Sequence, residues 1–242
     1  MVTQSRLIAM TDAERTAALA GPPEEVARLL LEAAEAGHAE AQLLTGQLHL
    51  DGNGVARDAA EALRWFGLAA KAGSPMAMNM IGRCCEHGWG TVIDKALAAQ
   101  WYRSAADRGL AWGMYNLATL YTLGEGVSED KEEALNLFER AAALEHAKSI
   151  NMIGSFYEDG WVAERNLVTA ASHYRKAAEG GDFRGQFNHA RMLAEAGDLD
   201  HARHWLSKMT ETATPAFREK ARMWMTQQTS PIWHDDLIRA VD

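Results

Sequence analysis

One pattern returns at a fixed interval along this chain, and this repetition limits the folds that the chain can adopt. The segment GNGVARDAAEALRWFGLAAKAG, residues 52–73, returns 36 residues later as GWGTVIDKALAAQWYRSAADRG and again as GEGVSEDKEEALNLFERAAALE. A fourth copy reads GWVAERNLVTAASHYRKAAEGG, and no insertion or deletion is needed to align the four. Self-similarity at this interval is typical of a repeat array in which each copy is one supersecondary unit.

Each copy contains two helical patterns, named helix A and helix B in chain order. Helix A ends at Gly52, which can adopt positive φ, and Gly54 is expected to loosen the turn that follows. Asp58 is a good N-cap for helix B, and Glu61 stands at the capping-box position. Helix B then places large and small apolar residues on one face: Ala62, Trp65, Phe66, Ala69 and Ala70.

Small residues recur inside helix A and predict how the helices approach one another. They are Gly46, Gly82, Ala118, Gly154 and Ala190, and the aromatic residues of helix B are expected to fill the space beside them. One hairpin cannot cover its own apolar face, so neighbouring units must stack. The prediction is an all-α, right-handed superhelical solenoid of antiparallel helical hairpins with 36-residue repeats.

The array is expected to form a single α-solenoid domain over residues 1–242. A degenerate N-terminal unit covers 1–37, with DAERTAALA as its helix A and EEVARLLLEAAEAGH as its helix B. Four repeats cover 38–181, and a degenerate fifth hairpin covers 182–212. Residues 213–242 are expected to form a capping helix and a tail, which either packs as a terminal cap, occupies the groove or recruits another protein.

Composition argues against several classes of function. The net charge of −9 disfavours a nucleic-acid partner. No apolar run is long enough for a secretory signal or a membrane span, so a cytoplasmic protein without a membrane partner is expected. Cys84 and Cys85 are adjacent, lie at positions of core residues and are expected to be packed thiols. His201 and His204 have a spacing that can hold a metal, but we predict no metal, no cofactor and no catalytic residue.

The pattern A-x-A-x-x-x-(L/I)-G, then G-x-G-V-x-x-D-x-x-x-A, then W-(Y/F)-x-x-A-A resembles the Sel1-like repeat family, relatives of tetratricopeptide repeats. The resemblance covers roughly residues 22–212 and implies an adaptor that holds protein partners. Some cysteine-rich relatives are linked to β-lactam binding or hydrolysis. The Cys pair that those relatives carry in each repeat is missing here, which argues against that branch.

Binding residues are expected where equivalent positions of the repeats differ. In the resembling family helix A lines the concave surface, so we predict a groove along a helix A stripe. Trp112 and Tyr115 would anchor the partner, although both could instead be extra core. The polar members are expected to hold a peptide backbone or carboxylate, with a solvated groove wall as the alternative. The stripe consists of Asn79, Arg83, Trp112, Tyr115, Thr119, Asn151, Ser155, Arg184, Phe187 and Arg191.

Two loop tryptophans suggest a second interface. Trp89 and Trp161 lie between the loop glycines, where other units have Asn53 and Glu125. They are either exposed along one edge or folded over the next loop. The sequence therefore predicts a non-enzymatic adaptor, monomeric or weakly dimeric, that binds a protein or peptide. The alternative is a hydrolase related to the β-lactam-binding branch.

Overall fold

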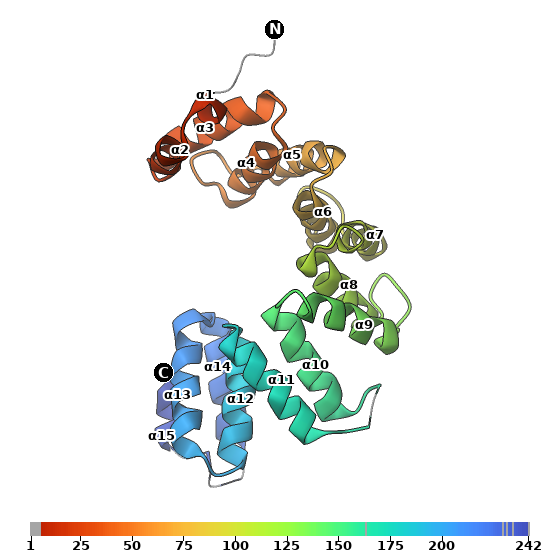
Figure 1. Cartoon of the computed structure of the whole chain (residues 1–242), viewed down its shortest axis with the longest axis vertical. Coiled ribbons are helices and arrows are strands. Elements are labelled where there is room, and N and C mark those ends of the chain that lie inside the picture. Colours follow the sequence, from red (N-terminus) through yellow and green to blue (C-terminus); the bar gives the residue numbers. More distant parts are fainter. Residues whose placement is uncertain (1–5, 163, 229, 231, 234, 242) are drawn as a thin grey trace. The chain divides into compact units, whose positions relative to one another are not determined.

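The computed structural model describes residues 6–162, 164–228, 230, 232–233 and 235–241. Every regular element within these ranges is a helix (Figure 1). Within each of the two compact units described below, most consecutive helices contact one another, and together with the repeat pattern this confirms the predicted all-α solenoid of hairpins. The contacts group residues 1–129 and residues 130–242 into two compact units, and each unit is described by itself. A single domain over 1–242 stays a prediction.

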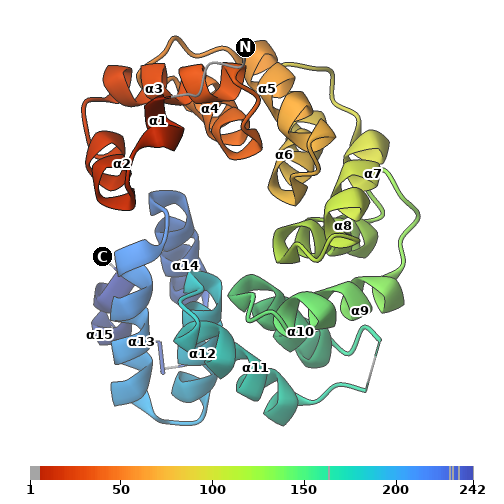
Figure 2. The same cartoon turned by 45° about the horizontal axis from the view of Figure 1, so that its top comes forward.

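The first unit contains the degenerate N-terminal segment, two full repeats and helix A of the third. Its helices lie side by side as successive hairpins (Figure 2). In α4/α5 and α6/α7 the first helix is helix A and the second is helix B; α8 is again a helix A. The bounds are α1 Arg6–Ala9, α2 Asp12–Leu19, α3 Pro23–Glu35, α4 Ala39–Asp51, α5 Ala59–Lys71, α6 Pro75–His87, α7 Lys95–Ala106 and α8 Ala111–Leu123.

The second unit continues the same alternation. Its first helix, α9, is the helix B of the third repeat; α10/α11 is the fourth repeat and α12/α13 the fifth hairpin. The bounds are α9 Lys131–Ala142, α10 Ala147–Asp159, α11 Leu167–Glu179, α12 Phe183–Glu195, α13 Leu199–Thr212, α14 Pro215–Gln227, α15 Asp235–Ile238 and the 3₁₀ helix η1 Arg239–Val241.

The turn between helix A and helix B forms largely as its sequence predicts. Gly52 ends α4 with φ of 74°, and the Asp58 carboxylate accepts hydrogen bonds from the backbone N–H of Ala60 and Glu61, each at 3.0 Å. The predicted capping box is wrong, however. The Glu61 side chain bonds to the guanidinium of Arg64 instead, because a cation one turn along the helix is the stronger donor.

The second glycine of the loop has a different role from the one expected. A Cβ on Gly54, at φ of 70°, would lie 2.1 Å from the carbonyl oxygen of Pro23. Gly90 stands in the same relation to the carbonyl oxygen of Ala59, at 2.2 Å. The glycine therefore does not loosen the turn. It lets each loop lie against the start of the preceding helix B, where a side chain has no room.

The small residues of helix A receive the aromatic rings of helix B, as predicted. A Cβ on Gly82 would lie 2.6 Å from the ring of Tyr102, and a Cβ on Gly154 would lie 2.6 Å from the ring of Tyr174. Gly46 stands equally close to Phe66. These rings are completely buried, so the glycines set the distance between the two helices of each hairpin.

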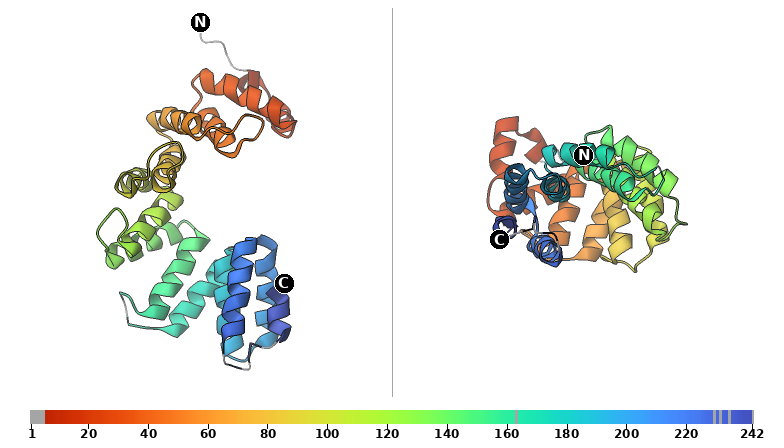
Figure 3. Two further views of the ribbon diagram at one scale, coloured as in Figure 1. Left: turned by 180° about the vertical axis from the view of Figure 1, so that it is seen from behind. Right: turned by 90° about the horizontal axis from the view of Figure 1, so that it is seen from below.

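The two ends of the chain are covered in different ways. At the N-terminus α2 buries none of its residues, and Leu7 of α1 enters the core beside Leu29 and Leu30 instead. In the C-terminal unit α13, α14 and the tail are neighbours (Figure 3), and Trp233, Leu237 and Val241 of the tail are buried in one cluster with residues of α13 and α14. The described part of the tail therefore packs as a cap.

Candidate protein-binding surface

The stripe takes three positions from each helix A, and the middle position is occupied by Asn79, Tyr115, Asn151 and Phe187. In α6 and α10 this middle position lies in the contact with the next helix A. Asn79 of α6 is 3% exposed, and its Oδ1 accepts a hydrogen bond from Nδ2 of Asn116 in α8 at 2.8 Å. Asn151 of α10 is 4% exposed and accepts from Nδ2 of Asn188 in α12 at 2.9 Å. The predicted role of Asn79 and Asn151 as exposed peptide-binding amides is therefore corrected, because each amide is used inside the array.

Phe187 occupies the same middle position in α12 and makes the equivalent contact. Its ring meets Trp224 of α14 edge-on at 5.6 Å between centroids, and Phe217 of α14 at 6.0 Å. The pairing of Phe187 with Trp224 has the same sequence offset as the two asparagine pairs. Helix α14 therefore stacks in the register of a sixth helix A, and Phe187 faces this helix rather than an open groove.

The flanking positions of the stripe are more accessible, as is Tyr115 at the middle position of α8. Trp112 is 38% exposed, and its ring stands edge-on to Tyr115 with 6.1 Å between centroids. Tyr115, Arg83 and Thr119 are half-buried on the same unit. The Arg83 guanidinium lies over Trp89 at 5.0 Å, and the Thr119 hydroxyl donates to the carbonyl oxygen of Tyr115. The first unit thus brings these helix A residues to the surfaces of α6 and α8.

In the second unit the flanking positions are occupied by the protein's own contacts. The Ser155 and Tyr174 hydroxyls lie within hydrogen-bond distance of each other, at 3.2 Å. Arg184 is exposed, and its guanidinium lies over the ring of Phe183 at 4.7 Å and over Phe217 of α14 at 5.6 Å. The surface around Arg184, which was predicted to line the groove, is therefore partly covered by α14.

Arg191, the last member of the stripe, is part of a half-buried polar cluster. Its Nη2 donates to the Glu158 carboxylate at 2.6 Å, and the Tyr174 hydroxyl donates to the same oxygen at 2.6 Å. Burial acts to raise the pKa of Glu158, but the hydrogen bonds from Arg191 and Tyr174 outweigh it and the pKa is lowered. Arg191 is thus a partner of Glu158 inside the array.

The first unit contains the same acid and phenol, which the sequence reasoning missed. Glu86 and Tyr102 stand two repeats before Glu158 and Tyr174, and the Tyr102 hydroxyl donates to the Glu86 carboxylate at 2.5 Å. A signal was present in the sequence: the tetrapeptide Asn-Met-Ile-Gly occurs at 79–82 and again at 151–154. The second and fourth repeats are therefore more alike than consecutive repeats are.

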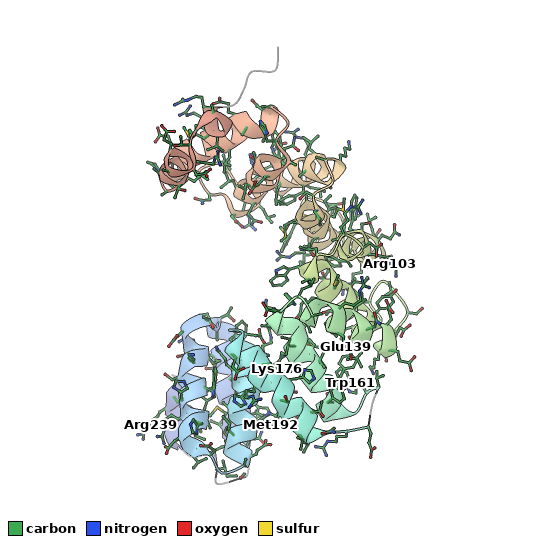
Figure 4. All side chains as sticks on the ribbon, viewed as in Figure 1. Arg103, Glu139, Trp161, Lys176, Met192 and Arg239 are labelled. Atoms are coloured by element: carbon green, nitrogen blue, oxygen red, sulfur yellow. The ribbon has the colours of Figure 1, made fainter. Side chains whose placement is uncertain are left out.

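The two loop tryptophans are partly covered by their own surroundings. Trp89 is half-buried. Its ring centroid lies 4.8 Å from that of His87, and the Arg83 guanidinium lies over the ring at 5.0 Å. Trp161 is 40% exposed; its ring packs edge-on against Phe156 at 5.0 Å, and the Lys131 ammonium lies over it at 5.2 Å (Figure 4). A second interface at these residues stays a prediction.

The residue types that carry chemistry do not assemble into a reactive centre within the described part of the chain. Cys84 and Cys85 are buried free thiols, as predicted, and burial raises the pKa of Cys84 to about 11. No group of three or more His, Cys, Asp or Glu side chains is arranged around a metal position among the described residues. His201 bonds to Asp198 at 2.8 Å. Of the described helices, none has the length and apolarity that crossing a bilayer requires.

Hairpins of this kind, stacked through helix A contacts, define an α-solenoid of the tetratricopeptide type. The Sel1 repeat profile matches residues 39–74, 75–110, 113–146 and 147–182. The chain belongs to the Sel1 repeat family. Proteins of this kind generally act as interaction modules.

Solved structures show the same architecture. A Sel1 repeat protein from Oxalobacter formigenes is 22% identical, with a TM-score of 0.78 over 96% of this chain and 100% of that one. The antigen c5321 of uropathogenic Escherichia coli is 27% identical, with a TM-score of 0.67 over 90% of this chain, which spans about half, 48%, of that protein. No curated protein matches the chain in sequence.

Proposed function

We propose that this chain is a non-enzymatic adaptor that binds a peptide or helix of a partner protein on the helix A surface of its first unit. The observation that carries the proposal is Trp112, a large aromatic side chain that is 38% exposed and held edge-on by Tyr115. Other repeats have Met76 and Lys148 at this position, so the scaffold itself does not require a tryptophan there. Tryptophan and tyrosine are the side chains that most often dominate the energy of protein interfaces.

The first unit is preferred over the second because of what covers each helix A surface. In the second unit α14 lies against Phe187 and Arg184, and Arg191 is bonded to Glu158. The net charge of −9 favours a basic or neutral partner. The hydrolase alternative has no supporting arrangement of residues in the described part of the chain, where the two thiols are buried.

Affinity capture from a native lysate of the source organism, followed by binding measurements on the purified partner, tests this proposal. Trp112→Ala is the informative variant, and Trp161→Ala is the matched control because it removes an equally exposed tryptophan from a loop of the other unit. We expect Trp112→Ala to weaken binding at least about tenfold, the usual cost of losing an aromatic anchor, while Trp161→Ala binds like the wild type.

A partner that binds the wild type and folded Trp112→Ala equally well would show that the helix A surface of the first unit is not the site. Loss of binding only in Trp161→Ala would move the site to the loop edge. Turnover of a chromogenic β-lactam by the purified protein would contradict a non-enzymatic role.

A further inference from the structure

The second unit shows how this scaffold holds a guanidinium group. The Glu158 carboxylate accepts hydrogen bonds from Tyr174 and from Arg191, both at 2.6 Å. The Arg191 and Glu158 side chains are only 12% and 21% exposed. The guanidinium also lies at 6.0 Å from the ring of Trp224 and at 3.4 Å from Glu195. A half-buried acid, oriented by a phenol, thus binds the arginine of the neighbouring helix A.

The first unit has the acid and the phenol but lacks the arginine. Tyr102 reaches across Gly82 and donates to Glu86 at 2.5 Å, as Tyr174 reaches across Gly154 to Glu158. The position of Arg191 is taken by Thr119, whose hydroxyl donates to its own helix. Glu86 is half-buried.

Arg83, the nearest cation of the same helix, acts on the Tyr102 hydroxyl through its charge but makes no ion pair with Glu86. Arg83 stands one turn before Glu86, but its guanidinium lies over the ring of Trp89 at 5.0 Å and its Nη1 approaches the sulfur of Met80 at 3.7 Å. No ion pair joins Glu86 to any residue of the described ranges. A half-buried carboxylate with one neutral donor is stabilised by an added cation more than a fully solvated carboxylate is.

We propose that Glu86 and Tyr102 receive an arginine side chain of the partner, in the place that Thr119 leaves beside them. This inference rests on the proposed adaptor function and names the chemistry of its ligand. Arginine fits better than lysine because its planar guanidinium donates several hydrogen bonds in fixed directions and costs less to desolvate. The same side chain fills the equivalent place two repeats later.

The experiment uses a phage-displayed library of random 12-residue peptides selected on the full-length wild-type chain. Enriched peptides are synthesised in pairs that differ only by arginine or citrulline, which keeps the shape and removes the charge. We expect the enriched peptides to contain arginine. Glu86→Gln, Thr119→Arg and the citrulline exchange are each expected to weaken binding about 10- to 100-fold, the range for a hydrogen-bonded charge pair.

Thr119→Arg makes the test independent of a folding defect, because it supplies the missing guanidinium internally and leaves Glu86 intact. Glu132→Gln is the matched charge control: it removes the same charge from an exposed position of the helix B α9 and is expected to leave binding unchanged. Combined with Glu86→Gln, the citrulline exchange is expected to cost little more than either change alone.

Other results separate this inference from the adaptor function. Peptides that lose affinity with Trp112→Ala but bind Glu86→Gln like the wild type would overturn the arginine site and leave the adaptor surface standing. Equal affinity of arginine and citrulline peptides, or of arginine and lysine peptides, would also overturn it. A selection that enriches no peptide, or only peptides that bind Trp112→Ala and Glu86→Gln like the wild type, would refute both proposals.

Discussion

The glycine of helix A sets the distance between the two helices of a hairpin, and Gly82→Ala tests this directly. The new Cβ would lie 2.6 Å from Cδ1 and Cε1 of Tyr102, whose ring is completely buried. Overpacking of this kind costs about 1–3 kcal/mol. Alanine in place of glycine inside a helix returns about 1 kcal/mol. We therefore expect Gly82→Ala to lower the free energy of unfolding by about 1 kcal/mol, the middle of the resulting range.

Gly67→Ala is the matched control within the same unit. Gly67 lies inside α5, and a Cβ there would meet no atom within 4 Å. This variant keeps the gain in helix propensity without the clash, so it is expected to stabilise the first unit by about 1 kcal/mol. The difference between the two variants, about 1–3 kcal/mol, measures the overpacking alone.

Urea unfolding followed by far-ultraviolet circular dichroism measures both variants against the wild type. Both substitutions lie in the first unit, so they are compared on the same transition. If Gly82→Ala stabilises the protein as much as Gly67→Ala does, the close approach of α6 to the Tyr102 ring does not limit the packing of the hairpin, and the reasoning from the glycine positions fails.

Three further perturbations test the polar and aromatic positions. Arg191→Met leaves Glu158 without its cation and is expected to lower the free energy of unfolding at pH 7 by about 2 kcal/mol, less than the roughly 3–5 kcal/mol of a fully buried pair. In the wild type the pKa of Glu158 is lowered by folding, so the stability that the pair contributes is present above the unfolded-state pKa of this carboxyl group and is lost as the pH falls below it. Equal urea midpoints of the wild type and Arg191→Met at pH 7 would contradict the pairing. Burial lowers the pKa of His146 to about 4, so stability should fall as the pH drops from 6.5 towards 4, and an NMR titration with a midpoint above 6 would refute this. Leu50 is buried and stands at the register position of Glu86, so the hydroxyl added by Phe66→Tyr would have no acceptor there. We expect Phe66→Tyr to lower the free energy of unfolding in urea by about 1–3 kcal/mol, and Leu50→Glu to restore it.

The parts of the fold that depend on local chemistry could be predicted from the sequence. Asp58 caps helix B because a carboxylate before a first turn has the same backbone donors in any context. Gly46 and Phe66 could be matched because a small and a large residue recur in fixed register on facing helices. Both inferences use only the residues of one hairpin.

The exposure of each residue in the helix A stripe depends on contacts with the next repeat and was only partly predictable from the sequence. Positions three residues apart on a helix point only about 60° apart, so one stripe can include both a position on the exposed face and a position that packs against the next helix A. Asn79 and Phe187 occupy the middle position, which packs against the next helix A, and Trp112 occupies a position nearer the exposed face. Only the packing between successive repeats shows which position of the stripe is buried and which is exposed.

The second loop glycine illustrates the same limit. Gly54 could be assigned positive φ from its residue type, and the structure has φ of 70° there. Its close approach to the carbonyl of Pro23 involves the start of helix B in the preceding hairpin, outside the repeat that contains Gly54. A pattern within one repeat contains no information about that distance.

The repeats alternate in a way that a single-repeat pattern conceals. The helix B aromatic is Phe66 in the first repeat, Tyr102 in the second, Phe138 in the third and Tyr174 in the fourth. Where the ring carries a hydroxyl, a glutamate accepts from it; the first repeat instead has buried Leu50 at the position of that glutamate. A buried phenol and a half-buried carboxylate stabilise the fold only as a pair, because either alone would leave a polar group without its partner. The chemical unit of this array is therefore two hairpins long, so a polar site recurs at every second repeat. The site of the fourth repeat is filled by Arg191, and Thr119 stands at the equivalent position of the site that we propose for a partner arginine in the second repeat.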